Sequence, residues 1–553
     1  MNIFPRAALA AALAVSLAAC EGDDGDDGAP GAAGSPGSDG ASSLIAQTTL
    51  PQGDDNCGVG GTRIDSGIDD NGNGTLDADE IDATSFVCNG DANAFTLDRA
   101  ARLLETNANI ALAAYEDSVD TAKALKTAID SFAANPTQAG LDAAKMAWLV
   151  AREPYGQTEV YRFRNSPIDS TNYMDEDGPE GAINAWPLGE ALIDTVVISP
   201  GTVDDFETDQ VGISSSSTPI AGGGAVDGSD PAVNIIASSV TIDAALLDGS
   251  ASADDERDVI SGYHAIEFLL WGQDLNNNGM VTVGTDRETA VKSNGAANLA
   301  AGGQRPLTDF TSDAGAARRL LYLQVATDKL IADLESVVDG WRDGVDGNYR
   351  DQFTTINNTS EALERLTEIL TGMGTLSEGE LAGERMQISF SANSQEDEHS
   401  CFADNTHRDI LLNAEGISNS FYGDYSGYDA DLDGADGAGD NTDRAVSGYG
   451  FDDLARDLGG DVATVAAALD TAIQETTTAV GTIDASARAG SPVDVLIQTA
   501  NLNETNPMFT SILALNGQST EIANLAEALE IAEDVVDDDA SECDTTNPTE
   551  ECG

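Results

Sequence analysis

Apolar residues recur at steps of three and four along most of the chain, and this spacing limits the fold more than any other feature. The first series starts at Leu97 and ends at Phe132, and it includes Leu104, Tyr115 and Leu125. Further series of the same spacing lie in 320–341, 462–473 and 522–532. Such side chains share one face of an α-helix, and long helices with one apolar face pack as antiparallel bundles. We therefore predict an all-α main domain over residues 94–536.

The N-terminus has the pattern of an exported lipoprotein. Residues 1–19 contain Arg6 and then an apolar stretch too short to span a bilayer, which indicates a signal peptide. The stretch ends in Leu-Ala-Ala-Cys, which is similar to the bacterial lipoprotein cleavage box, so Cys20 would carry the lipid. We expect a cell-envelope protein held by its lipid anchor only, on the periplasmic or surface face of the outer membrane. An ordinary signal peptide followed by a chance cysteine is the alternative.

The charge balance excludes one class of partner. The chain has 97 acidic and 25 basic residues, which gives a formal net charge of -72. Such a surface repels phosphate backbones and attracts cations. We therefore expect no nucleic-acid partner.

A glycine-rich segment follows the leader. Glycine occupies every third position from Gly22 to Gly40. This repeat is compatible with a short collagen-like helix, but a flexible spacer fits so few triplets better. We predict that residues 20–49 form a lipidated, disordered spacer.

Residues 50–92 are predicted to form a small, loop-rich unit closed by a disulfide between Cys57 and Cys88. It contains DDNGNGTLDADE, whose oxygen-bearing residues follow the spacing of a calcium-binding loop. The expected Ca²⁺ ligands are Asp69, Asn71, Asn73, Thr75, Asp77 and Glu80. A metal-free turn is the alternative, and two weaker echoes, which begin at Asp274 and Asp429, are interpreted as polar turns.

The remaining cysteines predict one more disulfide. An exported chain meets an oxidising compartment. We expect Cys543 to pair with Cys552 in the acidic tail, 537–553, and Cys401 to remain a buried or reactive thiol.

His264 and Glu267 are the first candidates for a metal site. They are three residues apart in SGYHAIEFLLWGQDL, so a helix would project both from one face, as paired ligands in helical bundles do. A histidine bonded to a carboxylate inside a core is an equally common arrangement.

GYHAIE resembles the GxHxxE signature of the imelysin family. Four further segments, which start at Ala147, Asn184, Gly303 and Glu384, agree with that family in type and order. The resemblance implies an all-α fold of two pseudo-repeated helical-bundle lobes, with the functional site in the cleft between them. It also implies an envelope protein linked to iron uptake, with other iron-uptake envelope proteins as partners.

The resemblance also implies which residues form that site. The metal ligands would be His264, Glu267, Glu153, Glu398 and His399. Arg152, Tyr155 and Gly262 would be the other residues of the cleft. The structural alternative is an interhelical salt bridge of Arg152 with Glu153, and for His399 it is a helix cap.

The motifs favour binding over hydrolysis. Neither HExxH nor HxxEH is present, so the paired ligands and base of the helical zinc peptidases are missing from the sequence. Imidazole and carboxylate ligands suit iron, and also zinc or copper. We interpret the protein as a transition-metal binder, iron preferred, that serves iron acquisition. A metallopeptidase of the same fold and a calcium-dependent adhesion or scaffold protein are the alternatives.

Overall fold

The computed structural model describes residues 42–52, 59–88, 94–175, 177–196, 234–248, 259–274, 302–395, 397–434, 437–498, 502–531, 534–536 and 543–552. The chain divides into two compact units, 1–91 and 92–553. The predicted signal peptide, Cys20, Cys57 and most of the 198–239 segment lie outside the described residues. Cysteine pairing in the first unit therefore stays a prediction.

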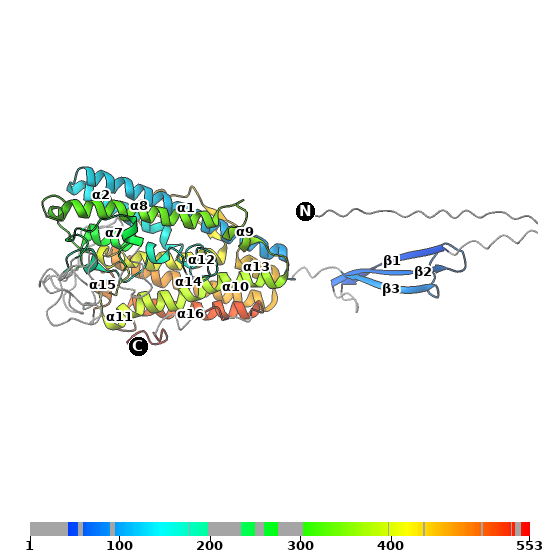
Figure 1. Ribbon diagram of the computed structural model, residues 1–553. Helices are drawn as coiled ribbons and strands as arrows, with labels where there is room; N and C mark the ends of the chain where they lie inside the picture. The colour runs from blue at the N-terminus through cyan, green and yellow to red at the C-terminus, as the bar shows by residue number, and fades with distance from the viewer. Residues whose placement is uncertain are drawn as a thin grey trace, which may run out of the picture. The chain divides into compact units, whose positions relative to one another are not determined.

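The first unit contains a three-stranded antiparallel sheet in the order β1-β2-β3 (Figure 1). The strands are β1 (Ser42–Gln52), β2 (Val59–Asp69) and β3 (Ile81–Cys88). The sheet corrects two expectations, because the unit is not loop-rich and the spacer cannot extend to residue 49. After Gly40 the glycine repeat gives way to SSLIAQTTL, and isoleucine and threonine favour a pleated strand. The calcium-like loop connects β2 to β3.

The second unit begins with a helical bundle built on the longest helix. The bundle consists of α1 (Leu97–Ala134), α2 (Gln138–Gly156), α7 (Gly262–Trp271) and α8 (Ala316–Trp341). Helix α1 starts where the Thr96 hydroxyl accepts a hydrogen bond from the Arg99 backbone N–H. It packs on α2 and α8, and α7 packs on α2 and α8. The predicted long helix is confirmed.

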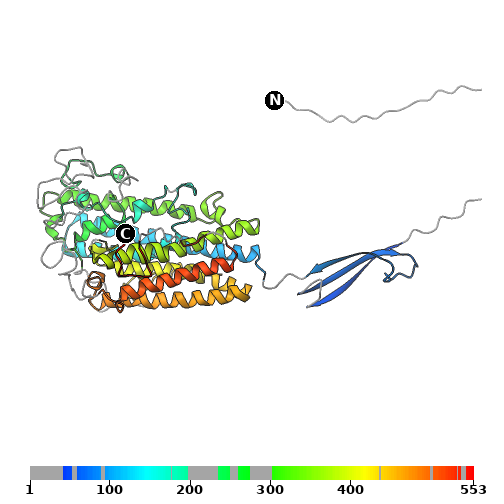
Figure 2. The same cartoon turned by 90° about the horizontal axis from the view of Figure 1, so that it is seen from below.

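A second bundle follows in the chain. It consists of α10 (Thr359–Thr375), the π-helix η4 (Leu376–Gln387), α12 (Thr406–Tyr422), α14 (Gly460–Arg488) and α16 (Pro507–Ala528). Figure 2 shows α14 and α16 side by side, and these two helices pack closely. The bundles meet where α1 contacts α10 and α2 contacts α12. The all-α prediction for the main domain is confirmed.

Short elements connect these helices. They are η1 (Glu159–Tyr161), α3 (Glu180–Ile183), α4 (Glu190–Ile193), α6 (Ala244–Asp248), η3 (Leu307–Phe310), α9 (Tyr349–Thr354), α11 (Ile388–Ala392), η5 (Cys401–Ala403), β4 (Asp424–Tyr425), β5 (Val446–Ser447), α13 (Phe451–Leu458) and α15 (Val493–Leu496). None of the helices in the described ranges combines the length and apolar character that a membrane crossing requires.

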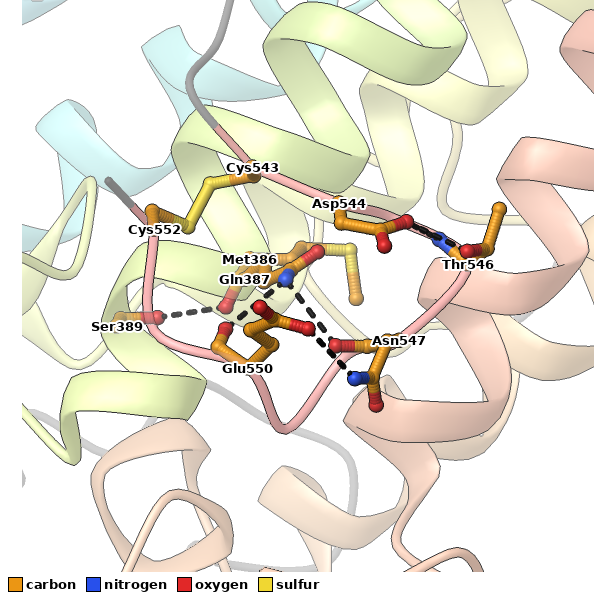
Figure 3. Close-up of a disulfide and its surroundings, with 9 residues drawn as sticks. All are labelled: Met386, Gln387, Ser389, Cys543, Asp544, Thr546, Asn547, Glu550 and Cys552. Atoms are coloured by element: carbon orange, nitrogen blue, oxygen red, sulfur yellow. Dashed lines mark hydrogen bonds between the residues drawn. A yellow bond between two sulfur atoms is a disulfide. The ribbon is translucent and has the colours of Figure 1, made fainter.

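The C-terminal tail folds back on the second bundle. Cys543 and Cys552 form a disulfide, as predicted, and it closes a short loop (Figure 3). The Gln387 amide donates hydrogen bonds to the backbone oxygens of Asn547, at 3.4 Å, and Glu550, at 3.1 Å. The disulfide therefore holds the loop in a shape that covers the end of the π-helix.

Candidate metal centre

Gly262 gives α7 its starting geometry. Its φ is +81°, a region that residues with a Cβ rarely adopt, and a Cβ there would lie 2.3 Å from the backbone oxygen of Ile183. The glycine of the GxHxxE signature is therefore a backbone requirement. It lets the first turn of α7 lie directly against α3.

His264 and Glu267 form a hydrogen-bonded pair inside the protein. Both side chains are 0% exposed, and 2.9 Å separates His264 Nδ1 from Glu267 Oε2. Glu267 Oε1 accepts a hydrogen bond of 2.8 Å from the Ala403 backbone N–H. Both carboxylate oxygens of Glu267 therefore have a hydrogen-bond partner within the protein.

His399 belongs to a second pair of the same kind. Its Nδ1 lies 3.1 Å from Asp409 Oδ2, which also accepts a hydrogen bond from the Ser400 hydroxyl. Asp409 Oδ1 accepts from Arg152 Nη2 at 2.9 Å. Arg152 therefore holds a carboxylate that in turn orients a histidine.

The two imidazoles meet where the bundles join. Their ring centroids are 4.6 Å apart and the rings are nearly perpendicular, at 85°. His264 comes from α7 of the first bundle, and His399 precedes α12 of the second. Among the described residues, the buried His264 Nε2 has no hydrogen-bond partner, and His399 Nε2 has only a long contact of 3.5 Å with the Asn184 amide. Two ring nitrogens are thus left for a ligand.

The site is closed. His264 is 0% exposed and His399 is 4% exposed. The Trp186 ring lies against His264 with a centroid distance of 5.0 Å, and Phe402 packs on Trp186. In the described part of the chain, both imidazoles are thus buried, and aromatic side chains cover His264.

Burial lowers the pKa of both histidines, which favours their neutral form. Desolvation, followed by the charge of neighbouring groups, lowers the pKa of His264 well below its usual value, and desolvation and Arg385 lower the pKa of His399. The carboxylates differ. Desolvation and then Asp409 raise the pKa of Glu267 well above its usual value. Desolvation also acts to raise the pKa of Asp409, but Arg152 and His399 outweigh it and lower that pKa well below the usual range.

A buried charge network surrounds the pairs. Asn184 donates to Glu159 Oε1 at 3.2 Å, and Arg385 donates to Glu159 Oε2 at 2.8 Å. Burial acts to raise the pKa of Glu159, but Arg385 and Arg162 outweigh it and lower the pKa to about 2. In the π-helix, hydrogen bonds span five residues. Arg385 Nε accordingly lies 2.9 Å from Glu380, five positions earlier.

Glu153 lies in an ion pair between α2 and α12. Its oxygens accept hydrogen bonds of 2.9 Å and 2.6 Å from Arg408, and its partner is therefore not Arg152, which pairs with Asp409. The rings of Tyr155 and Tyr263 are in tilted contact, with centroids 4.9 Å apart, and Arg152 lies over both rings. Glu398 is buried beside His399 in the chain.

Asp409, Asn184 and Trp186 were not predicted as site residues. Asn184 and Trp186 lie in NAWPLGE, and Asp409 lies in NTHRDI, both within segments that carry the family resemblance. Their order in the chain was visible, but their contacts with His264 and His399 depend on how the bundles meet.

The calcium-like loop has the backbone geometry of its motif. Asp69 accepts hydrogen bonds from the backbone N–H groups of Asn73, at 3.1 Å, and Gly74, at 2.8 Å. Gly74 has a φ of +78°. Glu80 accepts from the N–H groups of Asp70, Asn71 and Asp77 at 3.0 to 3.1 Å. The loop is therefore folded around its first and last carboxylates.

Two groups of three carboxylates have ligand atoms within 4.8 Å of one another in the described parts of the chain. They are Asp274, Asp404 and Asp494, which are buried, and Asp429, Asp431 and Asp433, which are mostly exposed. Neither group includes the histidine pairs or the Asp69 loop. Asp274 and Asp429 begin the two weaker echoes of the calcium motif.

Comparisons with known proteins agree with the sequence resemblance. The imelysin family model matches residues 111–522, and the model of a domain of unknown function, DUF7151, matches residues 42–88. Iron-regulated protein A of Synechococcus elongatus is 31% identical over 125 residues, which are 21% of this chain and 33% of that protein. The chain thus spans about a third of the length of this curated relative.

Two crystal structures align with most of this chain. One, from Parabacteroides distasonis, is described as an iron-regulated protein A precursor; it is 16% identical, with a TM-score of 0.48, over 80% of this chain and 98% of that chain. The other is an imelysin-like protein from Psychrobacter arcticum, which is 14% identical, with a TM-score of 0.44, over 81% of this chain and 99% of that chain.

Proposed function

Since this chain belongs to the imelysin family, we propose that it binds a transition-metal ion through His264 and His399 and serves iron acquisition. The observation that supports this most is the buried His264 ring, whose Nε2 has no hydrogen-bond partner in the described part of the chain and which lies beside a second imidazole. A buried polar atom without a partner costs free energy that a bound ligand recovers.

The donor set fits a metal of the later transition series. In both pairs Nδ1 is bonded to a carboxylate, the arrangement that fixes ring orientation around protein-bound metals and directs Nε2 toward the ion. Imidazole binds iron, zinc and copper, so the donors do not select among them. The preference for iron rests on the curated relative, whose name is iron-regulated protein A. His264 and His399 would hold the ion, while Glu267 and Asp409 would orient them.

Metal titration of single-histidine variants tests the proposal. His264→Ala and His399→Ala should each lose most of the iron and zinc affinity of the wild-type protein. His407→Ala is the matched control, because this third buried histidine lies 3.7 Å from Asp484 and belongs to neither pair. Unchanged affinity in both site variants would show that the imidazoles are structural.

The metallopeptidase alternative has its own test. The closed site and the absence of a paired HExxH base disfavour hydrolysis. The purified protein should therefore leave unfolded polypeptides intact with or without metal. Cleavage that a chelator stops and that His264→Ala abolishes would replace the binding proposal.

We also propose that the protein is a lipid-anchored envelope protein whose N-terminal unit binds Ca²⁺. The anchor rests on the leader and Cys20, and Cys20→Ser should abolish palmitate labelling. The calcium proposal is supported by the Asp69 loop, whose six motif residues supply carboxylate, amide and carbonyl oxygens. Calcium should raise the melting temperature of the N-terminal unit, and Glu80→Gln should remove that shift. An adhesion or scaffold role would depend on this calcium site.

A further inference from the structure

The sheet of the first unit has no hydrophobic core among its own described residues. Its three strands form a single antiparallel layer (Figure 1). Every buried apolar side chain in the described ranges lies between Ala100 and Val535, in the second unit. A three-stranded sheet is stable only when an apolar face of it is covered or a helix packs on it. The described part of the first unit supplies no such cover.

Exposed apolar side chains are concentrated on this sheet. Of the nine large apolar side chains that are exposed in the described ranges, four belong to its strands. They are Ile45, at 69%, Val87, at 59%, Ile68, at 44%, and Phe86, at 41%. A single exposed apolar residue is ordinary, whereas a group of them on one small element indicates an interaction surface.

The strand register puts three of these four side chains on one face. In an antiparallel sheet, paired residues point to the same side, and successive residues along a strand point to opposite sides. Ile45 on β1 pairs with Ser66 on β2. Val87 on β3 pairs with Thr62 on β2. Both partners lie an even number of residues from Ile68, so Ile45, Ile68 and Val87 share a face.

Among the strand residues that are paired on this face, none is charged. Besides the three exposed side chains, they are Ile64, Ala83 and serine, threonine and glutamine residues. The opposite face carries the ion pair of Arg63 with Asp65, and Phe86 pairs with Arg63 there. The chain as a whole has a net charge of -72. We therefore call the first side of the sheet the uncharged face.

The sequence before β1 indicates what covers the uncharged face. Glycine occupies every third position from Gly22 to Gly40, and β1 begins two residues later. Three chains with this repeat can wind into a collagen-like helix, because only glycine fits at its crowded axis. So few triplets hold three chains together weakly, but a second association surface on the same chain strengthens the contact, because linked sites have a high effective concentration. The sequence therefore favours further copies of this chain as the cover.

We propose that three copies of this chain associate through their N-terminal units, with the uncharged faces of the three sheets packed against one another. This contact buries Ile45, Ile68 and Val87 of each copy and supplies the apolar burial that one sheet lacks. The negative charge of the chain opposes association, and a contact on a face without charged side chains keeps that repulsion small. The proposal does not depend on the metal site, which lies in the second unit.

Sedimentation velocity of the full-length chain tests the proposal. The variant Cys20→Ser is the background for every measurement, so that a lipid cannot cause the association. At micromolar concentration this protein should sediment as a trimer. Adding Ile45→Thr and Val87→Thr together should raise the concentration at which half of the chains are monomeric by at least about tenfold, because apolar contact is lost.

Two controls separate the contact from the folding of the sheet. Threonine is β-branched like isoleucine and valine and favours strands, so the β2 amides should stay protected from hydrogen exchange in the double variant. Phe86→Thr is the matched control, because it removes an exposed apolar side chain from the opposite face. It should leave the trimer intact.

Ionic strength separates an uncharged contact from ion pairs. Salt screens the repulsion between acidic chains, so the trimer should become stronger as the NaCl concentration rises. A trimer that salt weakens would assign the association to ion pairs and overturn the proposal. The proposal is also overturned if the background protein sediments as a monomer or a dimer, if the double variant associates as strongly as the background, or if Phe86→Thr dissociates the trimer equally.

Discussion

The two histidine–carboxylate pairs have the same geometry and opposite electrostatics. In each, Nδ1 of a buried imidazole lies about 3 Å from a carboxylate oxygen. Asp409 also meets the guanidinium of Arg152, whereas Glu267 meets only a backbone N–H. The pKa of Asp409 is accordingly lowered and that of Glu267 is raised. In each pair, therefore, one contact sets the orientation of the imidazole, and a different contact sets the charge of the carboxyl group.

The opposite pKa shifts lead to different predictions for the protons of the two pairs. An ionised Asp409 would accept a hydrogen bond from His399 Nδ1–H, and His399 Nε2 would then carry the lone pair that binds a metal. A protonated Glu267 would instead donate to His264 Nδ1 and leave the remaining imidazole proton on Nε2. The proton on His264 Nε2 would have to leave before this nitrogen could bind a metal. The first pair thus resists binding in a way that the second does not.

The largest expected effect is the loss of stability when the carboxylate of Asp409 is replaced. Asp409→Asn leaves Arg152 buried without its ion-pair partner, and this type of change costs about 3 to 5 kcal/mol of unfolding free energy. Glu267→Gln preserves both hydrogen bonds of a protonated carboxyl and should cost about 1 kcal/mol or less. Urea unfolding of the metal-free variants measures both values. Equal losses would mean that Glu267 is ionised too.

Sequence alone predicted part of this site. The long helices and the His264–Glu267 pair followed from helical spacing, because neighbours on one helix are fixed by local geometry. His399 entered only through the family resemblance. Asp409 was missed, and Glu153 was predicted to be a metal ligand. The partner of each residue depends on the packing between α2 and α12. The sheet at 42–88 was missed because glycine and polar residues obscured a strand pattern.

Metal affinity should distinguish orientation from charge. Loss of an orienting carboxylate typically weakens binding about 10- to 100-fold. Asp409→Asn should fall in this range for iron or zinc. Glu267→Gln should fall at its upper end, because an amide that donates to Nδ1 keeps the proton on Nε2. Titration with a competing chelator measures the ratio, and a Glu267→Gln variant with wild-type affinity would contradict this proton assignment.

The pH dependence of stability should also separate the pairs. Below about pH 6.5 an unfolded histidine binds a proton, whereas the buried His399 does not, because its pKa is lowered in the folded state. Stability therefore falls as pH falls below the unfolded pKa of about 6.5. The limit is about 1.4 kcal/mol per pH unit for each histidine. The lowered pKa of His264 also reduces stability as pH falls. The raised pKa of Glu267 contributes the opposite sign, because its stabilisation is present at low pH and is lost as pH rises above about 4.5.

These contributions offset one another only in the first pair. His264 and Glu267 oppose each other between about pH 4.5 and 6.5, whereas the lowered pKa of Asp409 takes effect only below about pH 4. Glu267→Gln should therefore steepen the acid loss of stability, and His399→Gln should flatten it. Chemical unfolding of metal-free protein between pH 5 and 8 checks both slopes. A flatter slope in Glu267→Gln would mean that Glu267 is ionised in the folded state.

The smallest expected effect is the release of a single proton when the metal binds. If Glu267 is protonated in the metal-free protein, metal binding to His264 Nε2 requires the pair to lose one proton, because the ion favours a neutral imidazole whose Nδ1–H donates to a carboxylate. The His399–Asp409 pair already has that arrangement and should release none. Calorimetric titration in two buffers of different ionisation enthalpy should therefore give a release of about one proton per metal at pH 7. In Glu267→Gln the amide cannot ionise, so the release from the carboxyl group should disappear, whereas Asp409→Asn should retain it. A wild-type release near zero would show that both pairs hold their protons in the same way.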